Sequence, residues 1–391
     1  MSINGTILFS AFEPSGDALA SRLITELKRR QPDVRIMALG GPRMKAAGAE
    51  LIEVTTEHAV MLAGALKHAH EHHLRLKRVD AWLKANKIDA LVPTDSPAAN
   101  WGICRKVRKR CPNAKIVHLA APQLWAWAPW RIRKLRKLTD HVLCLLPFEE
   151  KWFGDRGVDA TFVGHPLFES EHAKVERGVD GKNEDDAVLN LEGEPKVALL
   201  PGSRPSEITK NWPTMLAAYE ALKAKHPGMR AVVAASDELR QAAIVDLCGG
   251  KLPNGMTIET SRAGLVLDWA DIGLIVSGTA TLQGVTHRLP MVSLYNVSKM
   301  GWNILGRWLI RNRPLTLPNL LSQHVMGENA TTELIPHFGE VEPVVDALEP
   351  LMTEGEARNR QVKIFETVCD RFVGRQFSVD AADQFMKVMR R

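Results

Sequence analysis

Two short segments of the chain combine small residues with backbone amides in a pattern that suits phosphate. The apolar run Ile272–Val276 predicts a buried strand, and the residues after it open a helix. These residues are Ser277, Gly278, Thr279, Ala280, Thr281 and Gln283. The unpaired N–H groups of such a helix and the positive end of its dipole point the same way. The segment therefore predicts an anion site.

A second segment of this kind lies upstream, where the apolar residues 197–200 precede Pro201, Gly202, Ser203 and Arg204. The guanidinium of Arg204 could pair with a diphosphate through two hydrogen bonds. Neither segment matches the P-loop or the dinucleotide glycine pattern. Together they favour a nucleotide-sugar donor over ATP or NAD. For either segment alone, a tight strand-to-helix turn without a ligand is an equally good interpretation.

A carboxylate stands where a general base could act. Asp95 directly follows the apolar residues 90–92, at the carboxyl end of a predicted strand. A positioned carboxylate that takes a proton in the transition state typically contributes about 10²- to 10⁴-fold to the rate. The alternative is structural, since an Asp just before Ser96 and Pro97 could also cap the next helix.

The loop after the first predicted strand, residues 7–9, is also polar. Glu13, Ser15, Gly16 and Asp17 would line a ligand cleft on the acceptor side. Capping of the following helix by Ser15 or Asp17 is the competing interpretation.

The organisation of the chain predicts an α/β fold. Its 391 residues exceed the size of a single core, so we expect two domains. Short apolar runs alternate with helix-like segments, which predicts two doubly wound, Rossmann-like domains that face a cleft. The expected boundaries are 1–168 for an acceptor-side domain, 169–194 for a linker and 195–364 for a nucleotide-sugar domain. Residues 365–391 form a helical segment that could return to the N-terminal domain.

Composition restricts the class of protein further. Hydrophobic residues make up 45% and charged residues 25% of the chain, as in ordinary soluble proteins. The five cysteines are scattered and lack a C-x-x-C pair, which favours reduced thiols in the cytoplasm over disulfides or zinc. We find no secretory signal and no apolar run of about 18 residues. His68 and His72 have the spacing of a metal pair, but no further ligand completes a site, and a solvated histidine face is favoured.

The net charge of +6 is concentrated in a few segments. Residues 105–110, 125–137 and 300–313 are basic, and the last two also contain tryptophans. In the last segment, Trp302, Leu305 and Leu309 share one helical face and Arg307 and Arg311 another, a pattern typical of a helix in a membrane interface. A surface helix with a core-facing side would look similar. No nucleic-acid-binding signature accompanies these segments, so we expect no nucleic acid partner.

Nine short motifs lie in order between residues 7 and 340. They are EPSGD (13–17), GPRM (41–44), TDSP (94–97) with Asn100, LWAW (124–127), LPFE (146–149), FVGHP (162–166), LLPGSR (199–204), SGTA (277–280) and LPNLL (317–321). In these motifs the chain resembles the lipid-A-disaccharide synthase family. The resemblance implies a glycosyltransferase of the GT-B type, with UDP bound by the C-terminal domain.

The reaction that the resemblance implies joins UDP-2,3-diacylglucosamine to 2,3-diacylglucosamine 1-phosphate and releases UDP. Inversion of the anomeric carbon in one displacement needs a base, which we expect to be Asp95. Arg204 and the amides of the 278–281 turn would meet the charge on the diphosphate. Asn319 is a further candidate for nucleotide contact. No Asp-x-Asp motif adjoins either turn, so we expect neither a divalent ion nor another cofactor.

Acylated substrates also imply a location and partners. We expect a peripheral protein at the inner face of the cytoplasmic membrane, docked through residues 300–313 or, failing that, 125–137. The sequence does not set the oligomeric state, and a homodimer is one expectation.

Three positions depart from the family pattern. Phe12 stands where the family has Gly, Ala98 where it has a second Asp, and Gln283 where it has a Glu for the ribose hydroxyls. These changes leave the acyl preference and the acceptor open. The alternatives are another GT-B transferase or epimerase acting on an unacylated sugar, and a catalytically silent lipid-binding relative.

Overall fold

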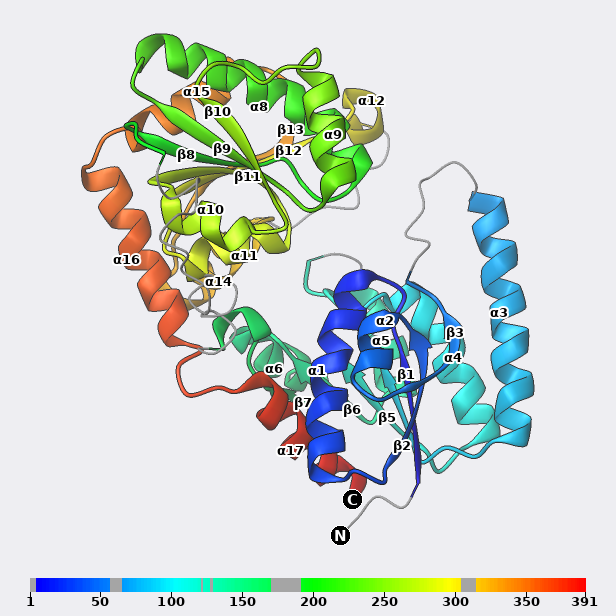
Figure 1. Cartoon of the computed structure of the whole chain (residues 1–391). Helices are drawn as coiled ribbons and strands as arrows, with labels where there is room; N and C mark the ends of the chain where they lie inside the picture. Colours follow the sequence, from blue (N-terminus) through cyan, green and yellow to red (C-terminus); the bar gives the residue numbers. More distant parts are fainter. Residues whose placement is uncertain (1–4, 57–64, 121, 127–128, 170–190, 304–313) are drawn as a thin grey trace. The chain divides into compact units, whose positions relative to one another are not determined.

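The computed structural model describes residues 5–56, 65–120, 122–126, 129–169, 191–303 and 314–391. The chain divides into two compact units (Figure 1). Unit 1 comprises Met1–Pro166 and Gly374–Arg391, and unit 2 comprises Leu167–Val373. Each unit is built around its own parallel sheet.

The sheet of unit 1 has seven strands in the order β3-β2-β1-β4-β5-β6-β7, and all neighbours run parallel. The strands are β1 (Thr6–Ser10), β2 (Arg35–Gly40), β3 (Glu50–Val54), β4 (Ala90–Pro93), β5 (Lys115–Leu119), β6 (His141–Cys144) and β7 (Ala160–Phe162). The helices are α1 (Pro14–Arg30), α2 (Pro42–Ala46), α3 (Ala65–Ala85), α4 (Pro97–Arg110), η1 (Pro129–Arg131), α5 (Ile132–Leu138), α6 (Pro147–Gly154) and α17 (Phe377–Met389). The short η2 (Pro166–Phe168) lies at the boundary between the units.

Both faces of this sheet are buried, as a parallel sheet requires. Successive side chains of a strand point to opposite faces. Phe9 therefore joins a core with α1 and α17, whereas Leu8 joins a second core that includes Trp101 of α4. Phe9 and Phe385 are fully buried. Burial of each such side chain stabilises the fold by about 1.5–3 kcal/mol.

The sheet of unit 2 has six strands in the order β10-β9-β8-β11-β12-β13, again parallel throughout. The strands are β8 (Lys196–Leu200), β9 (Arg230–Ala235), β10 (Met256–Thr260), β11 (Ile272–Val276), β12 (Met291–Asn296) and β13 (Thr332–His337). The helices are α8 (Pro205–Lys225), α9 (Glu238–Leu247), α10 (Ala263–Trp269), α11 (Thr279–Thr286), α12 (Lys299–Gly301), α14 (Leu317–Met326), α15 (Glu342–Leu348), η5 (Glu349–Leu351) and α16 (Glu356–Asp370). In Figure 1, α8, α9 and α15 cover one face of this sheet, and α10, α11 and α14 cover the other. Trp212 of α8 is the largest fully buried side chain of its core.

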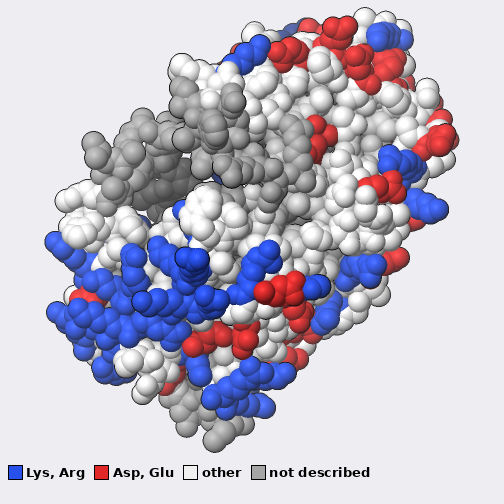
Figure 2. Space-filling view, turned by 180° about the vertical axis from the view of Figure 1, so that it is seen from behind, with Lys and Arg blue, Asp and Glu red and all other residues white. Residues whose placement is uncertain are grey.

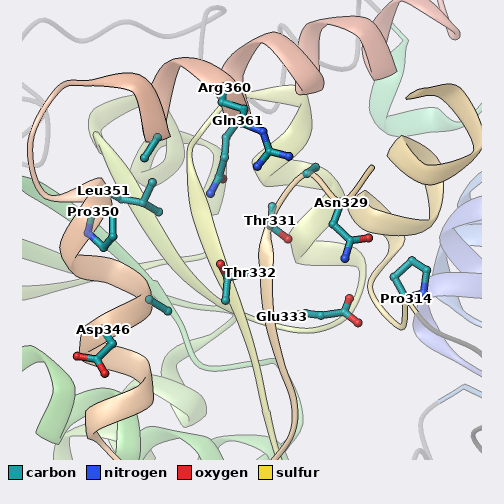
Figure 3. A pocket seen from close by; sticks show the side chains of 13 residues that line it. Pro314, Asn329, Thr331, Thr332, Glu333, Asp346, Pro350, Leu351, Arg360 and Gln361 are labelled. Carbon is teal, nitrogen blue, oxygen red and sulfur yellow. The ribbon is translucent and has the colours of Figure 1, made fainter. Parts of the chain in front are cut away.

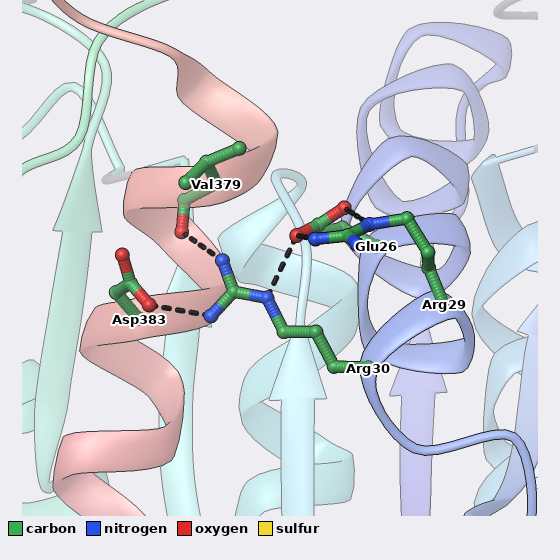
Figure 4. A network of polar contacts seen from close by, with 5 residues as sticks. All are labelled: Glu26, Arg29, Arg30, Val379 and Asp383. Carbon is green, nitrogen blue, oxygen red and sulfur yellow. Dashed lines mark hydrogen bonds and ion pairs between the residues drawn. The ribbon is translucent and has the colours of Figure 1, made fainter.

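The last helix of the chain, α17, belongs to unit 1 and packs against α1. Figure 4 shows the polar contacts that accompany this packing. Arg30 of α1 pairs with Asp383 of α17 and donates from Nη2 to the carbonyl oxygen of Val379 at 3.3 Å. Its Nε donates to Glu26 Oε1 at 2.7 Å, and Arg29 donates to both Glu26 oxygens at 2.8 Å. Glu26 thus orients the arginine that ties α17 to α1.

This network predicts a pH dependence at the acid end. The hydrogen bond from Arg29, helped by Arg30, lowers the pKa of Glu26 from 4.5 to about 2. Its contribution to stability should be fully present above pH 4.5 and lost as the pH falls toward about 2. Urea unfolding over that range should show a falling free energy of unfolding, and Glu26→Gln should reduce the fall. Parallel curves for the two proteins would contradict this role of Glu26.

The predicted α/β fold with two doubly wound, Rossmann-like units is confirmed, but two strands were missed. β3 and β13 are both edge strands, and their side chains are mostly half-buried rather than buried. β13 also contains Pro336, which breaks the expected strand pattern. The predicted linker 169–194 lies largely outside the described residues, as do most of segment 300–313 and the start of the helix expected at 61–85.

Candidate active site

Each sheet has one place where the strand order reverses. In unit 1 it lies between β1 and β4, and in unit 2 between β8 and β11. In doubly wound sheets, ligands bind beyond the carboxyl ends of the strands at such a switch point. The residues that follow these four strands are the EPSGD loop, Asp95, the PGSR turn and the SGTA turn. The sequence candidates therefore gather at both switch points.

The two loops at the switch point of unit 1 contact each other. Ser96 donates from Oγ to Glu13 Oε1 at 3.2 Å. A Cβ on Gly16 would lie 3.7 Å from the Asp95 Cβ, so the first turn of α1 runs close beside Asp95. Ser15, on the same turn, is exposed. Glu13, Gly16 and Asp95 thus lie together at the carboxyl edge of this sheet.

Asp95 is held in an unusual backbone conformation. It has a φ of 52° and Ser96 a φ of 31°, both in the left-handed region that side chains other than glycine seldom adopt. Asn100, which is fully buried, donates from Nδ2 to the carbonyl oxygens of Thr94 at 3.0 Å and of Asp95 at 2.9 Å. Ser10 of β1 in turn donates to Asn100 Oδ1 at 2.6 Å. Strain of this kind persists only where the surroundings enforce it, and it is frequent at active sites.

Asp17 has a structural role that the sequence did not indicate. Its carboxylate is only 2% exposed and accepts hydrogen bonds from the backbone amides of Gly41, Arg43 and Met44 at 2.9–3.1 Å. These are the amides at the start of α2, so Asp17 caps that helix from a distance. Both of its oxygens therefore already accept hydrogen bonds within the protein, and a ligand contact of Asp17 stays a prediction.

At the first turn of unit 2, a carboxylate occupies the amides that were expected to receive phosphate. Glu207 Oε2 accepts from the amides of Ser203 and Arg204 at 3.2 Å. Its Oε1 pairs with Arg204 Nη1 at 3.0 Å. The Arg204 side chain is nevertheless 64% exposed. Arg204 is therefore exposed beside the turn, whereas the amides of Ser203 and Arg204 already donate to Glu207.

The second turn of unit 2 is more open. Gly278 precedes α11 and is exposed, and a Cβ there would meet no atom within 4 Å. The amides of Thr279 and Ala280 are the first of the helix and have no acceptor within it. Thr281 is fully buried, and its amide and hydroxyl both bond to the Gly278 carbonyl oxygen, at 3.2 and 2.7 Å. Its side chain therefore stabilises the turn, and its contact with the donor stays a prediction.

Two further candidates lie deeper in unit 2. Gln283 is half-buried on α11, one turn after Thr279. Asn319 is fully buried in α14, where it donates to the Thr331 carbonyl oxygen at 2.9 Å and accepts from the Thr331 amide at 2.8 Å. It also donates to Glu333 at 3.1 Å. Asn319 therefore joins α14 to the start of β13, and its nucleotide contact stays a prediction.

Residues beside the PGSR turn that sequence reasoning missed are Asp237 and Arg240. Asp237 follows β9 and caps α9 by accepting from the Arg240 amide at 3.0 Å. Arg240 donates from Nε to the Ser203 carbonyl oxygen at 3.2 Å and so supports the turn that carries Arg204. The sequence could have indicated Asp237, because an Asp just after an apolar strand is a typical N-cap of the next helix.

A polar pocket of about 590 Å³ lies at the other end of unit 2, near the start of β13 (Figure 3). Its lining includes Glu333, Arg360 and Gln361. Glu333 accepts from the Leu315 amide at 3.0 Å, Gln361 accepts from the Met291 amide at 2.9 Å, and Arg360 pairs with Glu328. These side chains already have partners, and the pocket is far from the carboxyl edge. We assign it no ligand.

The expected histidine face and docking helix are described only in part. His70 and His73 are exposed on α3, but nothing is described of the His68 side chain. Within the described ranges, no group of three His, Cys, Asp or Glu is placed to bind a metal ion. Leu305 to Arg313 lie outside the described residues. Of the helices that are described, none has the length and apolar character to cross a bilayer.

Two parallel α/β units, each with polar turns at its switch point, are the architecture of the GT-B fold. Solved structures agree on this fold. The UDP-GlcNAc 2-epimerase of Neisseria meningitidis bound to UDP-GlcNAc matches with a TM-score of 0.60 at 9% identity, over 98% of this chain and 99% of that one. The spinosyn rhamnosyltransferase SpnG complexed with thymidine diphosphate matches with a TM-score of 0.62 at 12% identity, over 99% and 100%.

Sequence comparison is more specific. The family model for lipid-A-disaccharide synthetase matches residues 7–383. The lipid-A-disaccharide synthase of Pseudomonas entomophila is 33% identical over 382 residues, 97% of each chain. The chain belongs to the lipid-A-disaccharide synthase family, as its nine motifs predicted.

Proposed function

We propose that the protein transfers 2,3-diacylglucosamine from its UDP derivative to 2,3-diacylglucosamine 1-phosphate, forming a β-1,6-linked disaccharide 1-phosphate and UDP. The reaction follows from membership of the family. The observation that carries the assignment of residues is the gathering of the candidates at both switch points. Each unit would supply one half of the chemistry.

Unit 1 would supply the base. The acceptor hydroxyl oxygen attacks the anomeric carbon as the bond from that carbon to the diphosphate oxygen breaks, and the bonding electrons leave with UDP. The hydroxyl proton passes to the Asp95 carboxylate. Support for this role comes from the half-buried position of Asp95 and from the Asn100 contacts that fix its backbone. A carboxylate held in place loses little orientational freedom as it reacts.

Unit 2 would bind the donor. The Thr279 and Ala280 amides at the start of α11 would accept the diphosphate, and Arg204 would neutralise charge on the leaving group. The open space in front of Gly278 supports this role. Gln283 would accept from the ribose hydroxyls through its amide oxygen, and no cofactor or divalent ion is needed.

Both substrates carry acyl chains, so we also propose that the protein works at a membrane surface, peripherally and on the cytoplasmic side. A homodimer is our expectation for the assembly, and sedimentation velocity measures it. The proposed roles of Asp95, Arg204 and the α11 amides depend neither on the membrane location nor on the dimer.

Incubation with both acylated substrates in neutral detergent tests the reaction. Mass spectrometry should detect a disaccharide 1-phosphate and an equal amount of UDP. Conversion of UDP-GlcNAc to its 2-epimer without disaccharide would favour the epimerase alternative. Absence of any turnover with intact UDP binding would favour a silent relative.

Arg204→Ala should weaken UDP binding by about 10- to 150-fold, because a charge-assisted pair to diphosphate is worth about 1.5–3 kcal/mol. The loss should be at the lower end, because Glu207 already shares the guanidinium. Titration calorimetry with UDP measures it. Arg371→Ala, which removes an exposed arginine elsewhere in unit 2, is the control. Equal UDP affinity in both variants would make Arg204 only the partner of Glu207.

A further inference from the structure

One face of unit 1 is strongly basic (Figure 2). It is formed by α4 and the neighbouring α5, which contact each other. We call it the basic face and define it by its exposed cations, Arg105, Lys109, Arg133, Arg136 and Lys137.

Carboxylates near this face are already paired with other cations. Asp80 pairs with Arg110 at 2.8 Å and with Lys106 at 3.6 Å. Asp140 pairs with Arg108 at 2.7 Å. In the described part of the chain, Arg105, Lys109, Arg133 and Lys137 make no ion pair. The basic face thus keeps an uncompensated positive charge.

The cations also act on one another. Burial lowers the pKa of Lys134, and the charges of Arg105 and Arg131 lower it further. Lys134 lies 4.1 Å and Arg131 5.1 Å from the centre of the Trp101 ring of α4. Such crowding of like charge costs stability, so an anionic surface that approached this face would relieve it.

An exposed tryptophan adjoins the basic face. Trp130, in η1 directly before α5, is 70% exposed. Tryptophan is enriched where membranes meet water, because its ring is apolar and its N–H is polar. A tryptophan beside several cations suits a bilayer surface better than it suits bulk water.

One helix of the basic face, α4, starts beside the candidate base and carries Arg105 and Lys109 on its later turns. α4 begins at Pro97, two residues after Asp95, and Trp101 is on its second turn. Trp130 lies on the segment that connects the carboxyl end of β5 to α5. An acceptor whose acyl chains stay in the bilayer would present its sugar at this edge of unit 1.

We propose that the basic face and Trp130 dock unit 1 onto an anionic lipid bilayer and so bring Asp95 to an acceptor that remains in the membrane. This proposal rests on the proposed acylated substrates. The phosphate of anionic lipid headgroups is the complementary group, and each cation near such a surface strengthens binding about fivefold.

Cosedimentation with vesicles tests the surface. The native protein should pellet with vesicles of phosphatidylcholine and phosphatidylglycerol at low salt, remain free with phosphatidylcholine alone, and be released at high salt. The triple variant Arg105→Gln, Lys109→Gln, Arg133→Gln should bind the anionic vesicles about 100-fold more weakly. Trp130→Ser should also weaken binding but leave its salt dependence unchanged.

The control carries the same charge change on unit 2, as Lys251→Gln, Lys363→Gln, Arg371→Gln, all at exposed positions. It should bind vesicles as the native protein does. All variants are first compared by circular dichroism, thermal unfolding and UDP affinity, so that a folding defect is recognised. A folded triple variant that pellets like the native protein overturns the proposal, as does equal loss in the control.

Two further outcomes separate this proposal from others. Tight binding of the basic face to RNA, with no binding to anionic vesicles, would overturn it in favour of a nucleic acid partner. Disaccharide formation in detergent tests the reaction independently. Its failure with normal vesicle binding removes the proposed function, whereas its success without vesicle binding removes only the docking surface.

Discussion

Asp95→Asn should lower turnover by about 10²- to 10⁴-fold while leaving UDP affinity and stability nearly unchanged. The substitution removes the basic oxygen but keeps the size of the side chain. It also suits the backbone, because Asn tolerates the left-handed conformation that Asp95 adopts at φ 52°. Ala at this position would add backbone strain, so the effect of the lost carboxylate on turnover could not be separated from the effect of that strain.

Initial rates of UDP release with saturating substrates measure this effect. Asp33→Asn, at an exposed carboxylate of unit 1, is the matched control and should be fully active. Near-native turnover of Asp95→Asn would remove Asp95 from the base role and leave Glu13 as the nearest carboxylate on the neighbouring loop. A drop in turnover that accompanies a drop in stability would instead indicate a structural role.

Much of the fold could be predicted because most of its strands are buried on both faces. β1, β4, β8 and β11 appear in the sequence as short apolar runs, and they are the strands that flank the two switch points. The residues after them could therefore be selected without coordinates. The edge strands β3 and β13 are mostly half-buried and lack such a run, so their absence from the prediction has a physical cause.

Roles within the site were harder to predict than positions. Asp17 and Asn319 are polar residues in motifs of the family, yet both are buried and bonded to the backbone of distant segments. Local sequence cannot indicate this, since their partners lie 24 and 12 residues away. For Asn100 the sequence indicated no role of its own beside the TDSP motif. In the structure its side chain donates to the Asp95 carbonyl oxygen and so holds that backbone in place.

Glu207 shows why a turn that looks ready for phosphate need not present its amides. The prediction used the amides of the PGSR turn, but a carboxylate one helical turn later accepts from two of them. Its position, three residues after Arg204, is that of the acidic member of a capping box. At the SGTA turn the corresponding position, three residues after Gly278, is Thr281, which bonds to the Gly278 carbonyl oxygen and does not accept from the turn amides. Binding of the diphosphate by the first amides of α11 stays a prediction.

Glu149 presents a similar arrangement in unit 1, where a buried carboxylate organises the LWAW and LPFE motifs. Trp125 donates from Nε1 to Glu149 Oε1 at 3.0 Å. The amides of Leu145 and Leu146 donate to Oε2 at 3.1 and 3.0 Å. Glu149 therefore fixes both the turn after β5 and the start of α6, at the carboxyl edge that carries Asp95.

The stability of unit 1 should fall as the pH rises from about 4.5 to about 7, because burial raises the pKa of Glu149 from 4.5 to about 7. Between these values the folded state holds a proton that the unfolded chain releases. The associated stability is complete below pH 4.5 and is lost as the pH rises through about 7. The loss is at most about 3–4 kcal/mol, at roughly 1.4 kcal/mol for each pKa unit.

Glu149→Gln isolates this contribution, because the amide cannot titrate. Urea unfolding at a series of pH values should show the variant gaining stability relative to the native protein between pH 4.5 and 8. Glu50→Gln, at an exposed carboxylate of the same unit, should follow the native curve. A constant difference between Glu149→Gln and the native protein would mean that Glu149 is ionised throughout, held by its three donors. In that case the turn after β5 is fixed by a permanent charge, and the catalytic edge of unit 1 keeps its geometry at every pH at which the protein is folded.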